Sequence, residues 1–414
     1  MITENKQDFE IITGGITAPK GFQAAGKHIG IKKAKKDFAV IYSQVPALAS
    51  GVFTKNIVKA PPLYWCEKLI NSGKKIQAIG INSGNANACT GEKGYENAVE
   101  CAKLLAYSLN ISEESVLVTS TGVIGVYLPM DVMRKGIVET AKTISSSRDS
   151  AIDCAMAIMT TDTFTKEITV KLDINGVEVK IAGIAKGSGM IHPNMATMLN
   201  FITTDINIEK ELLDKAFKSN IDDSFNMITV DGETSTNDMA IILANGCANN
   251  KIVDKEDENY IKFKNALEFV LKYLAKSIVK DGEGATKMIE CHINGAKNKQ
   301  DARVLCKAIL NSNLVKTAFF GQDANWGRII SAMGATCLDF DPSKAKITFV
   351  SEQGKITLFE NGAPIAFDED FAFKILSENE IKVIVELQDG NAETIGWGSD
   401  LTYDYVKINA EYRS

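Results

Sequence analysis

The sequence predicts a mixed α/β fold organised in two lobes, and three observations support this. The chain has 414 residues, which exceeds the usual size of a single hydrophobic core. An Asn-Gly pair stands between two strictly alternating apolar runs over 168–181, and residues 261–279 carry apolar side chains at helical spacing. We place the division near residues 285–300 and expect a main domain over 1–290 and a C-terminal α+β domain over 291–414.

The N-terminal part alternates strand-like and helix-like segments. Residues 38–54 predict a buried strand and a turn, because Pro46 and Gly51 interrupt the apolar run. Residues 76–91 pass from a short apolar run into a cluster of Asn, Ser and Gly. Residues 116–129 predict a β-branched strand that breaks at its glycines. Between the last two strands, helical spacing is shown by Ala98, Cys101, Ala102, Leu104 and Leu105.

The later segments follow the same two periodicities. Asn175-Gly176 is the expected turn of the hairpin, since Asn-Gly readily takes positive φ. The glycine-rich run Asp281–Ala285 is typical of a helix C-terminus. The remaining predicted elements are helices at 209–220, 261–279 and 301–314, a hairpin at 345–359 around Gly354 and a strand at 381–387.

Composition and charge exclude several classes of protein. The formal net charge is −6 with acidic and basic residues interspersed, so we expect no nucleic-acid or membrane partner. No segment approaches eighteen consecutive apolar residues, and the N-terminal residues lack an apolar signal region. We therefore expect a cytoplasmic protein that acts on small molecules.

Cysteine and histidine usage gives poor support for a zinc site and for a disulfide framework. The three histidines do not occur at metal-ligand spacing, and the eight cysteines form no CxxC pair. No GxSxG, GxxxxGK[ST] or GxGxxG motif is present. Any catalytic nucleophile must therefore be of another kind. The cysteines, which we expect to be mostly buried apolar residues, are Cys66, Cys89, Cys101, Cys154, Cys247, Cys291, Cys306 and Cys337.

The least ordinary stretch is residues 185–205, which contains Met-Ala-Thr-Met-Leu between a glycine-rich segment and an apolar strand. Taken alone, Thr197 in this stretch is more simply a packing residue of the strand. The alternative is chemical: a strained loop would let the Thr197 hydroxyl attack the carbonyl of Ala196, and hydrolysis of the resulting ester would cut the chain. Cleavage would give chains 1–196 and 197–414.

A free N-terminal Thr197 would carry its own base. Its α-amino group has an ordinary pKa of about 7.7–8.0 and lies within reach of its hydroxyl, which permits a covalent ester intermediate without a histidine. Such a site also needs donors for an oxyanion. Thr121 and Gly122, at the end of a predicted strand, could supply a hydroxyl and a backbone N–H, although strand-to-glycine turns are usually structural.

At this point the chain resembles the ornithine acetyltransferase family of arginine biosynthesis, also called the ArgJ or glutamate N-acetyltransferase family. The resemblance covers nearly the whole sequence in the correct order. The matching stretches are GGITAPKGFQAAG at 13–25, GVFTKNIVKAPP at 51–62, NSGNANACTG at 82–91, TSTGVIG at 119–125, AIMTTDT at 157–163, KGSGMIHPNMATML at 186–199, VDGETSTND at 230–238, GQDANWGR at 321–328 and NAEYRS at 409–414.

The resemblance assigns roles residue by residue. It implies that cleavage falls between Ala196 and Thr197, that Thr197 is the acyl acceptor, and that Thr121 and Gly122 bind the oxyanion. It also implies a fold with stacked β-sheets between helical layers, autoprocessed like an N-terminal-nucleophile enzyme. Besides Thr197, the implied substrate contacts are Thr160 (adjoined by Thr161), Lys186, Glu283, Asn409 and Ser414.

The function implied is transfer of the acetyl group of N-acetylornithine to glutamate through an acetyl-Thr197 ester, without cofactor or metal. Some family members also accept acetyl-CoA, and the motifs do not distinguish the two cases. The resemblance further implies a heterotetramer of two α and two β chains. Two alternatives stay open: an N-terminal-nucleophile amidase or aminopeptidase, and an uncleaved, non-catalytic amino-acid-binding protein.

Two further groups of polar residues have simpler interpretations. Asp231, Glu233 and Asp238 do not have EF-hand spacing, so we expect a structural turn rather than a metal site. Trp326 and Arg328 are expected to order a loop near the site rather than to act in the chemistry.

Overall fold

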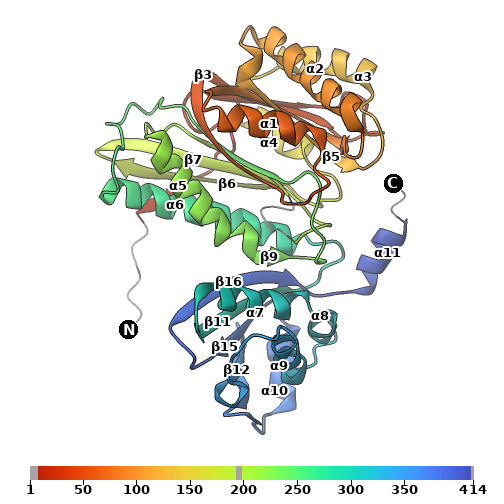
Figure 1. Ribbon diagram of the computed structural model, residues 1–414, viewed down its shortest axis with the longest axis vertical. Coiled ribbons are helices and arrows are strands. Elements are labelled where there is room, and N and C mark those ends of the chain that lie inside the picture. The colour runs from red at the N-terminus through yellow and green to blue at the C-terminus, as the bar shows by residue number, and fades with distance from the viewer. Residues whose placement is uncertain (1–7, 193–197, 412–414) are drawn as a thin grey trace.

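The computed structural model describes residues 8–192 and 198–411 (Figure 1). Its larger sheet has nine strands, and eight of them follow the order β1-β6-β7-β8-β10-β3-β4-β5, while β2 pairs with β3. Their bounds are β1 Phe9–Ile11, β2 Phe22–Lys27, β3 Phe38–Phe53, β4 Ile76–Asn85, β5 Val116–Val123, β6 Lys166–Ile174, β7 Val177–Lys186, β8 Leu199–Thr204 and β10 Met239–Ala244.

The long strand β3 joins two layers of this sheet. Residues 48–53 of β3 pair with β10, whereas residues 38–42 pair with both β2 and β4. The predicted turn at Pro46 and Gly51 is wrong, because β3 continues through both residues. Its register with β4 shifts between Tyr42 and Ala47, and Pro46 lies at this irregularity, where a missing N–H is tolerated.

Helices cover both outer faces, so the predicted arrangement of stacked sheets between helical layers is confirmed. Figure 1 shows α1, α2 and α3 on one side and α5 and α6 on the other. Between the two layers, Ile184, Phe201 and Ile241 pack in one core with residues of β3, β4 and β5. The helices are α1 Pro61–Asn71, α2 Gly91–Leu109, α3 Met130–Ala141, α4 Arg148–Ala157, α5 Lys210–Asp222 and α6 Glu258–Lys280.

A second, seven-stranded sheet lies below the first in Figure 1, in the order β14-β13-β12-β15-β11-β16-β9. Its strands are β9 Ile228–Thr229, β11 Met288–Ala296, β12 Lys346–Ser351, β13 Gly354–Glu360, β14 Ala363–Pro364, β15 Glu380–Glu386 and β16 Ala392–Ser399. The remaining helices are α7 Lys299–Asn311, α8 Asn313–Phe320, α9 Trp326–Gly334, α10 Glu369–Ser377 and α11 Tyr403–Glu411. Short 3₁₀ turns occur at Glu113–Ser115, Phe225–Met227 and Pro342–Lys344.

The two sheets share structure across the predicted domain boundary. Strand β9, which precedes α6, pairs with β16, and β11 spans residue 290. One hydrophobic core also runs from α5 and α6 into the second sheet. These contacts cross the predicted boundary at residue 290. The division into domains 1–290 and 291–414 stays a prediction.

Local sequence explains the hairpin and the long helix. Asn175 and Gly176 have φ values of 56° and 77°, and they join β6 to β7 with Ile174 opposite Val177, as predicted. Helix α6 begins after Asp257, whose side chain accepts a hydrogen bond from the Asn259 N–H at 3.0 Å. The described residues include no helix long and apolar enough to cross a membrane.

Strands that precede residue 193 in the sequence lie next to strands that follow residue 197 in the larger sheet. Strand β8 pairs antiparallel with β7 and parallel with β10, and β10 pairs with β3. The β8–β10 pair, which follows residue 197, is thus enclosed between β7 and β3, which precede residue 192. Backbone hydrogen bonds connect the two parts of the chain along both flanks of this pair.

Candidate active site

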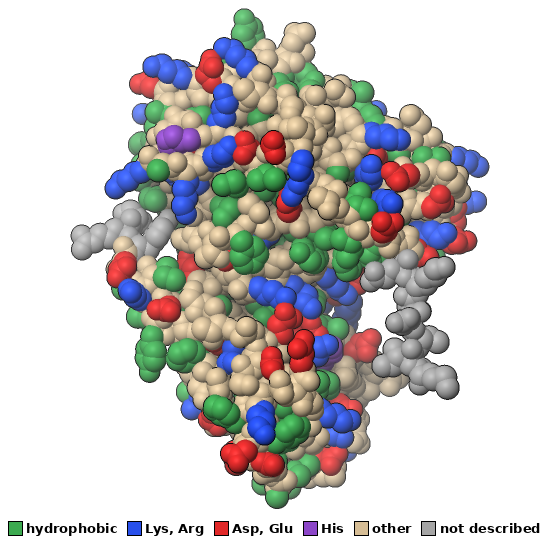
Figure 2. All heavy atoms as spheres, turned by 180° about the vertical axis from the view of Figure 1, so that it is seen from behind, with side chains coloured by type: hydrophobic (Ala, Val, Ile, Leu, Met, Phe, Trp, Pro, Cys, Tyr) green, Lys and Arg blue, Asp and Glu red, His purple; other side chains and the backbone are tan. Residues whose placement is uncertain are grey.

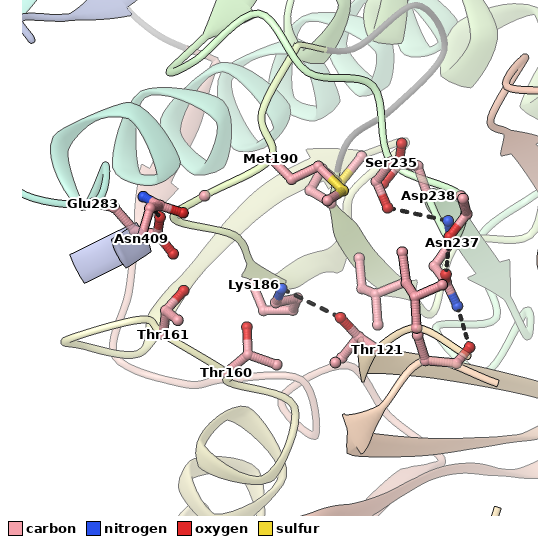
Figure 3. Close-up of a pocket in the computed structure, with 17 residues that line it drawn as sticks. Thr121, Thr160, Thr161, Lys186, Met190, Ser235, Asn237, Asp238, Glu283 and Asn409 are labelled. Carbon is pink, nitrogen blue, oxygen red and sulfur yellow. Dashed lines mark hydrogen bonds between the residues drawn. The ribbon is translucent and has the colours of Figure 1, made fainter. Parts of the chain in front are cut away.

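A pocket of about 170 Å³ lies where β5, β7 and β8 meet the loop before β10 (Figure 3). Polar side chains dominate its labelled lining in Figure 3. Six of the predicted site residues line it: Thr121, Gly122, Thr160, Lys186, Glu283 and Asn409. Ala196, Thr197 and Ser414 lie outside the described residues, but Met198 and Leu199 line the same pocket, so the chain enters it directly after position 197.

The turn at the end of β5 is held rigidly. Gly122 has φ of 134°, and a Cβ there would lie 2.3 Å from the backbone carbon of Gly84 on β4. No residue with a side chain fits this close approach. Thr121 beside it is buried, and its Oγ1 accepts a hydrogen bond of 3.4 Å from the Lys186 Nζ.

Lys186, at the end of β7, places a buried ammonium group in the pocket. Burial lowers the pKa of Lys186, while the carboxylate of Asp162 raises it and the ammonium of Lys166 lowers it. A buried cation with few fixed partners is suited to bind an anionic group of a ligand.

Thr160 and Thr161 both line the pocket, so the choice between them stays open. In Figure 3 both lie on the side of the pocket away from Asn237 and Asp238. The Thr160 N–H donates to a carboxylate oxygen of Asp162 at 2.9 Å, which fixes the backbone of this segment.

The C-terminal helix α11 closes one side of the pocket. The Asn409 Nδ2 donates to Glu283 Oε2 at 2.9 Å, and the Tyr405 hydroxyl lies 3.4 Å from Asp231. Glu283 itself is positioned by its N–H, which donates to the Ser188 carbonyl at 3.1 Å. Asn409 therefore lies in the pocket, as a tail folded into the cleft requires.

The sequence motifs did not reveal a buried ionic cluster beneath the pocket. The Lys166 Nζ lies 2.7 Å from Asp162 Oδ1 and 2.5 Å from Asp281 Oδ2, and all three side chains are at most 2% exposed. The one available sequence signal is that Asp162 and Lys166, which carry opposite charges, are four residues apart. Asp281 comes from the end of α6, and no sequence pattern connects it to them.

Asn237 is a second residue that sequence reasoning missed. Its buried side-chain amide donates to the carbonyl oxygens of Ala86, at 2.6 Å, and Ser120, at 2.8 Å. It thereby connects the loop before β10 to the turn that holds Thr121. The motif VDGETSTND contained Asn237, but its role required knowledge of the strand order.

Of the acidic residues in the motif 230–238, Asp238 lines the pocket, whereas Asp231 lies in a turn. Asp231 accepts hydrogen bonds from the N–H groups of Met190, Ile191 and Glu233, as in a structural turn. No group of three metal-binding side chains occurs in the described parts of the chain. Five of the eight cysteines are buried, whereas Cys89 and Cys337 are exposed and Cys247 is intermediate.

The loop containing Trp326 and Arg328 lies at the start of α9. Trp326 stacks on Phe359 with ring centroids 4.8 Å apart, and Arg328 donates to the Leu314 carbonyl at 2.7 Å. Neither residue lines the pocket.

A pocket that gathers a threonine hydroxyl, a glycine turn and a buried ammonium group has the composition expected of an acyl-transfer enzyme. Comparison with known proteins gives a narrower identity. The ArgJ family model matches residues 23–414, and the chain belongs to the ArgJ family.

Individual relatives match over nearly their full length. The arginine biosynthesis bifunctional protein ArgJ of Caldanaerobacter subterraneus subsp. tengcongensis is 54% identical, covering 98% of this chain and 100% of its own. That of Thermotoga neapolitana is 51% identical, covering 96% and 99%. A solved chain of the Mycobacterium tuberculosis ornithine acetyltransferase complexed with ornithine is 36% identical, covers 45% of this chain and 100% of its own, and has a TM-score of 0.43.

Proposed function

We propose that this enzyme transfers the acetyl group of N-acetylornithine to glutamate through an ester on Thr197, after the chain is cut between Ala196 and Thr197. The observation that carries the proposal is the gathering of Thr121, Gly122 and Lys186 around the start of β8, with Met198 already lining the pocket. Membership of a family whose members are named for arginine biosynthesis supports the substrates.

The proposed reaction has two halves. In the first, the Thr197 hydroxyl attacks the acetyl carbonyl and its proton passes to the α-amino group of the same residue. The tetrahedral oxyanion accepts hydrogen bonds from the Thr121 hydroxyl and the Gly122 N–H, and ornithine leaves with the proton on its amine. In the second, the amine of glutamate attacks the ester and departs as N-acetylglutamate, which regenerates Thr197.

Hydrogen bonding around Thr121 supports its role as donor. Because the Lys186 ammonium already donates to Thr121 Oγ1, the Thr121 proton is free to point to another acceptor. A nearby positive charge also strengthens an O–H donor toward a developing oxyanion.

The remaining contacts suit an amino-acid substrate. Lys186 would bind the α-carboxylate, and Glu283 with Asn409 would receive the amine at the other side of the pocket. Thr160 and Ser414 complete the proposed set, and Ser414 follows three residues after the end of α11.

Three broader features belong to the same proposal. Acetyl-CoA would serve as an alternative donor, as the word bifunctional in the relatives' names suggests. The cut chains would assemble as a heterotetramer of two α and two β chains, and the enzyme would work in the cytoplasm.

The experiment combines intact-mass measurement with acetyl transfer. The purified protein should show two fragments, and N-acetylornithine should add one acetyl group to the fragment 197–414. Thr197→Ala should abolish both cutting and turnover, whereas Thr197→Ser should keep part of each. An uncut, fully active Thr197→Ala protein would refute the proposal, and release of free acetate faster than transfer to glutamate would favour an amidase.

A further inference from the structure

The Asp162 carboxylate accepts hydrogen bonds from two backbone N–H groups at the border of the pocket. One oxygen, Oδ2, accepts the Thr160 N–H at 2.9 Å, and the other, Oδ1, accepts the Gly187 N–H at 2.7 Å. Thr160 lines the pocket, and Gly187 directly follows Lys186, which lines it as well. A single carboxylate therefore fixes two of the proposed substrate contacts relative to each other.

The charge around Asp162 is organised and shielded from water. Its side chain is 0% exposed and pairs with Lys166, which in turn pairs with Asp281. The Thr163 N–H also donates to Asp281, at 3.0 Å, so the segment after Thr160 is tied at a second point. Two carboxylates and one ammonium leave one net negative charge, which the ammonium of Lys186 would balance.

The titration behaviour of Asp162 agrees with this geometry. Burial acts to raise the pKa of Asp162, but the ammonium groups of Lys186 and Lys166 and the Gly187 N–H outweigh it and hold the pKa well below its usual range. Asp162 is thus a permanent anion in the neutral range.

We propose that Asp162 is a positioning residue of the acyl-transfer site, which fixes Thr160 and Lys186 relative to each other and places a negative charge beside Lys186. The substrate class it serves is a carboxylate-bearing acyl donor or acceptor. This inference rests on the proposed function, in which Lys186 binds a substrate carboxylate.

Several charged groups act on Lys186, and their signs differ. The carboxylates of Asp162, Asp238 and Glu283 favour its charged form, whereas the ammonium groups of Lys166 and Lys32 oppose it. Among them, Asp162 is the one that also holds the backbone N–H next to Lys186. Removing the Asp162 carboxylate should therefore change both the electrostatic surroundings of Lys186 and the position of its backbone.

The experiment measures kcat and KM for N-acetylornithine across the neutral to alkaline range on cleaved enzyme. Lys186 binds a carboxylate below its pKa and loses this ability as pH rises through it. In Asp162→Asn, the alkaline limb of kcat/KM should move to lower pH, and KM should rise about tenfold, the loss typical when a hydrogen bond no longer fixes a charged binding residue. Lys166→Met removes a repelling cation, so its alkaline limb should move to higher pH.

Two control variants separate the possible failures. Lys186→Met should raise KM and abolish the alkaline limb that depends on Lys186; unchanged KM in this variant would overturn the proposed role of Lys186 itself. Asp131→Asn removes a carboxylate that is 96% exposed and should leave the profile unchanged. Melting temperatures of all variants would be recorded in parallel.

Two results would overturn the role of Asp162 while leaving the proposed function intact. The first is a normal KM and pH profile in Asp162→Asn together with a defective Lys186→Met. The second is a displacement of the limb in the same direction for Asp162→Asn and Lys166→Met, with equal losses of melting temperature, which would indicate only a structural role. If Asp162→Asn does not fold, Asp162→Glu decides: it keeps the negative charge but misplaces the two hydrogen bonds, so KM should rise, and a normal KM in that variant contradicts the inference.

Discussion

The side-chain amide of Asn237 donates a 2.8 Å hydrogen bond to the carbonyl oxygen of Ser120. The two residues are 117 positions apart in sequence, on opposite sides of residues 193–197. Ser120 immediately precedes Thr121, so the placement of the proposed oxyanion donors depends on a residue from the other part of the chain.

Replacement of Asn237 should therefore impair catalysis more than binding. Asn237→Ala leaves two buried carbonyl oxygens without this donor, and each costs about 1–3 kcal/mol. We expect a large loss of kcat with a small change in KM, measured by steady-state acetyl transfer. Asn237→Leu has nearly the same shape and no hydrogen-bond donor, so it should be equally impaired; an active Leu variant would contradict the explanation.

The turn at Gly122 can be tested against a second glycine nearby. Both Gly122 and Gly125 have positive φ, but a Cβ at Gly122 would meet backbone at 2.3 Å, whereas a Cβ at Gly125 meets nothing within 4 Å. Gly122→Ala should abolish activity and lower the melting temperature. Gly125→Ala should cost only about 1 kcal/mol of backbone strain. Equal effects in thermal unfolding and acetyl-transfer assays would show that the close approach is unimportant.

Lys32 should support the segment that carries Thr160. Its Nζ donates to the Met159 carbonyl at 2.6 Å, and its side chain packs against Gly84. Burial lowers the pKa of Lys32 to about 8, although Asp37 acts to raise it. Lys32→Met should raise KM about fivefold, as loss of the hydrogen bond to Met159 implies. Lys33→Met, at an exposed neighbour, is the matched control and should have normal kinetics.

Acid should destabilise the loop at His192. Burial and, to a smaller extent, the charge of Lys307 lower the pKa of His192 to about 4, although a hydrogen bond with Asn311 acts to raise it. Because the unfolded state takes up the proton near pH 6.5, the free energy of unfolding should fall as pH decreases from about 6.5 toward 4. In His192→Gln, the free energy of unfolding should depend less on pH in this range, as measured by denaturant titrations at several pH values. An unchanged pH dependence in this variant would refute the prediction.

Sequence periodicity predicted the separate elements well. The hairpin over 168–181, the helix over 261–279 and the strand over 381–387 are all present as β6–β7, α6 and β15. These depend on local patterns of apolar side chains and on turn residues. The predicted turn in 38–54 failed because Pro46 falls where β3 changes partners, and partner strands are not encoded locally.

The site was predicted mainly through motifs rather than through spacing. Thr121, Lys186 and Glu283 come from three separated motifs, and the fold brings them into one pocket. Asp281 and Asn237 act through contacts 115 and 117 residues away, respectively, which requires the strand order and the end of α6. Long-range ionic and carbonyl contacts of this kind leave no periodic signal in a single sequence.

The enclosure of β8 and β10 between β7 and β3 has a consequence for a chain cut before Thr197. Separation of the two chains would require breaking the backbone hydrogen bonds of β8 with β7 and of β10 with β3 at the same time. Such a loss of a central sheet amounts to unfolding. Dilution should therefore not dissociate them, and the lifetime of the pair is governed by the unfolding rate rather than by a dissociation constant. Such halves would not exchange between molecules as ordinary subunits do.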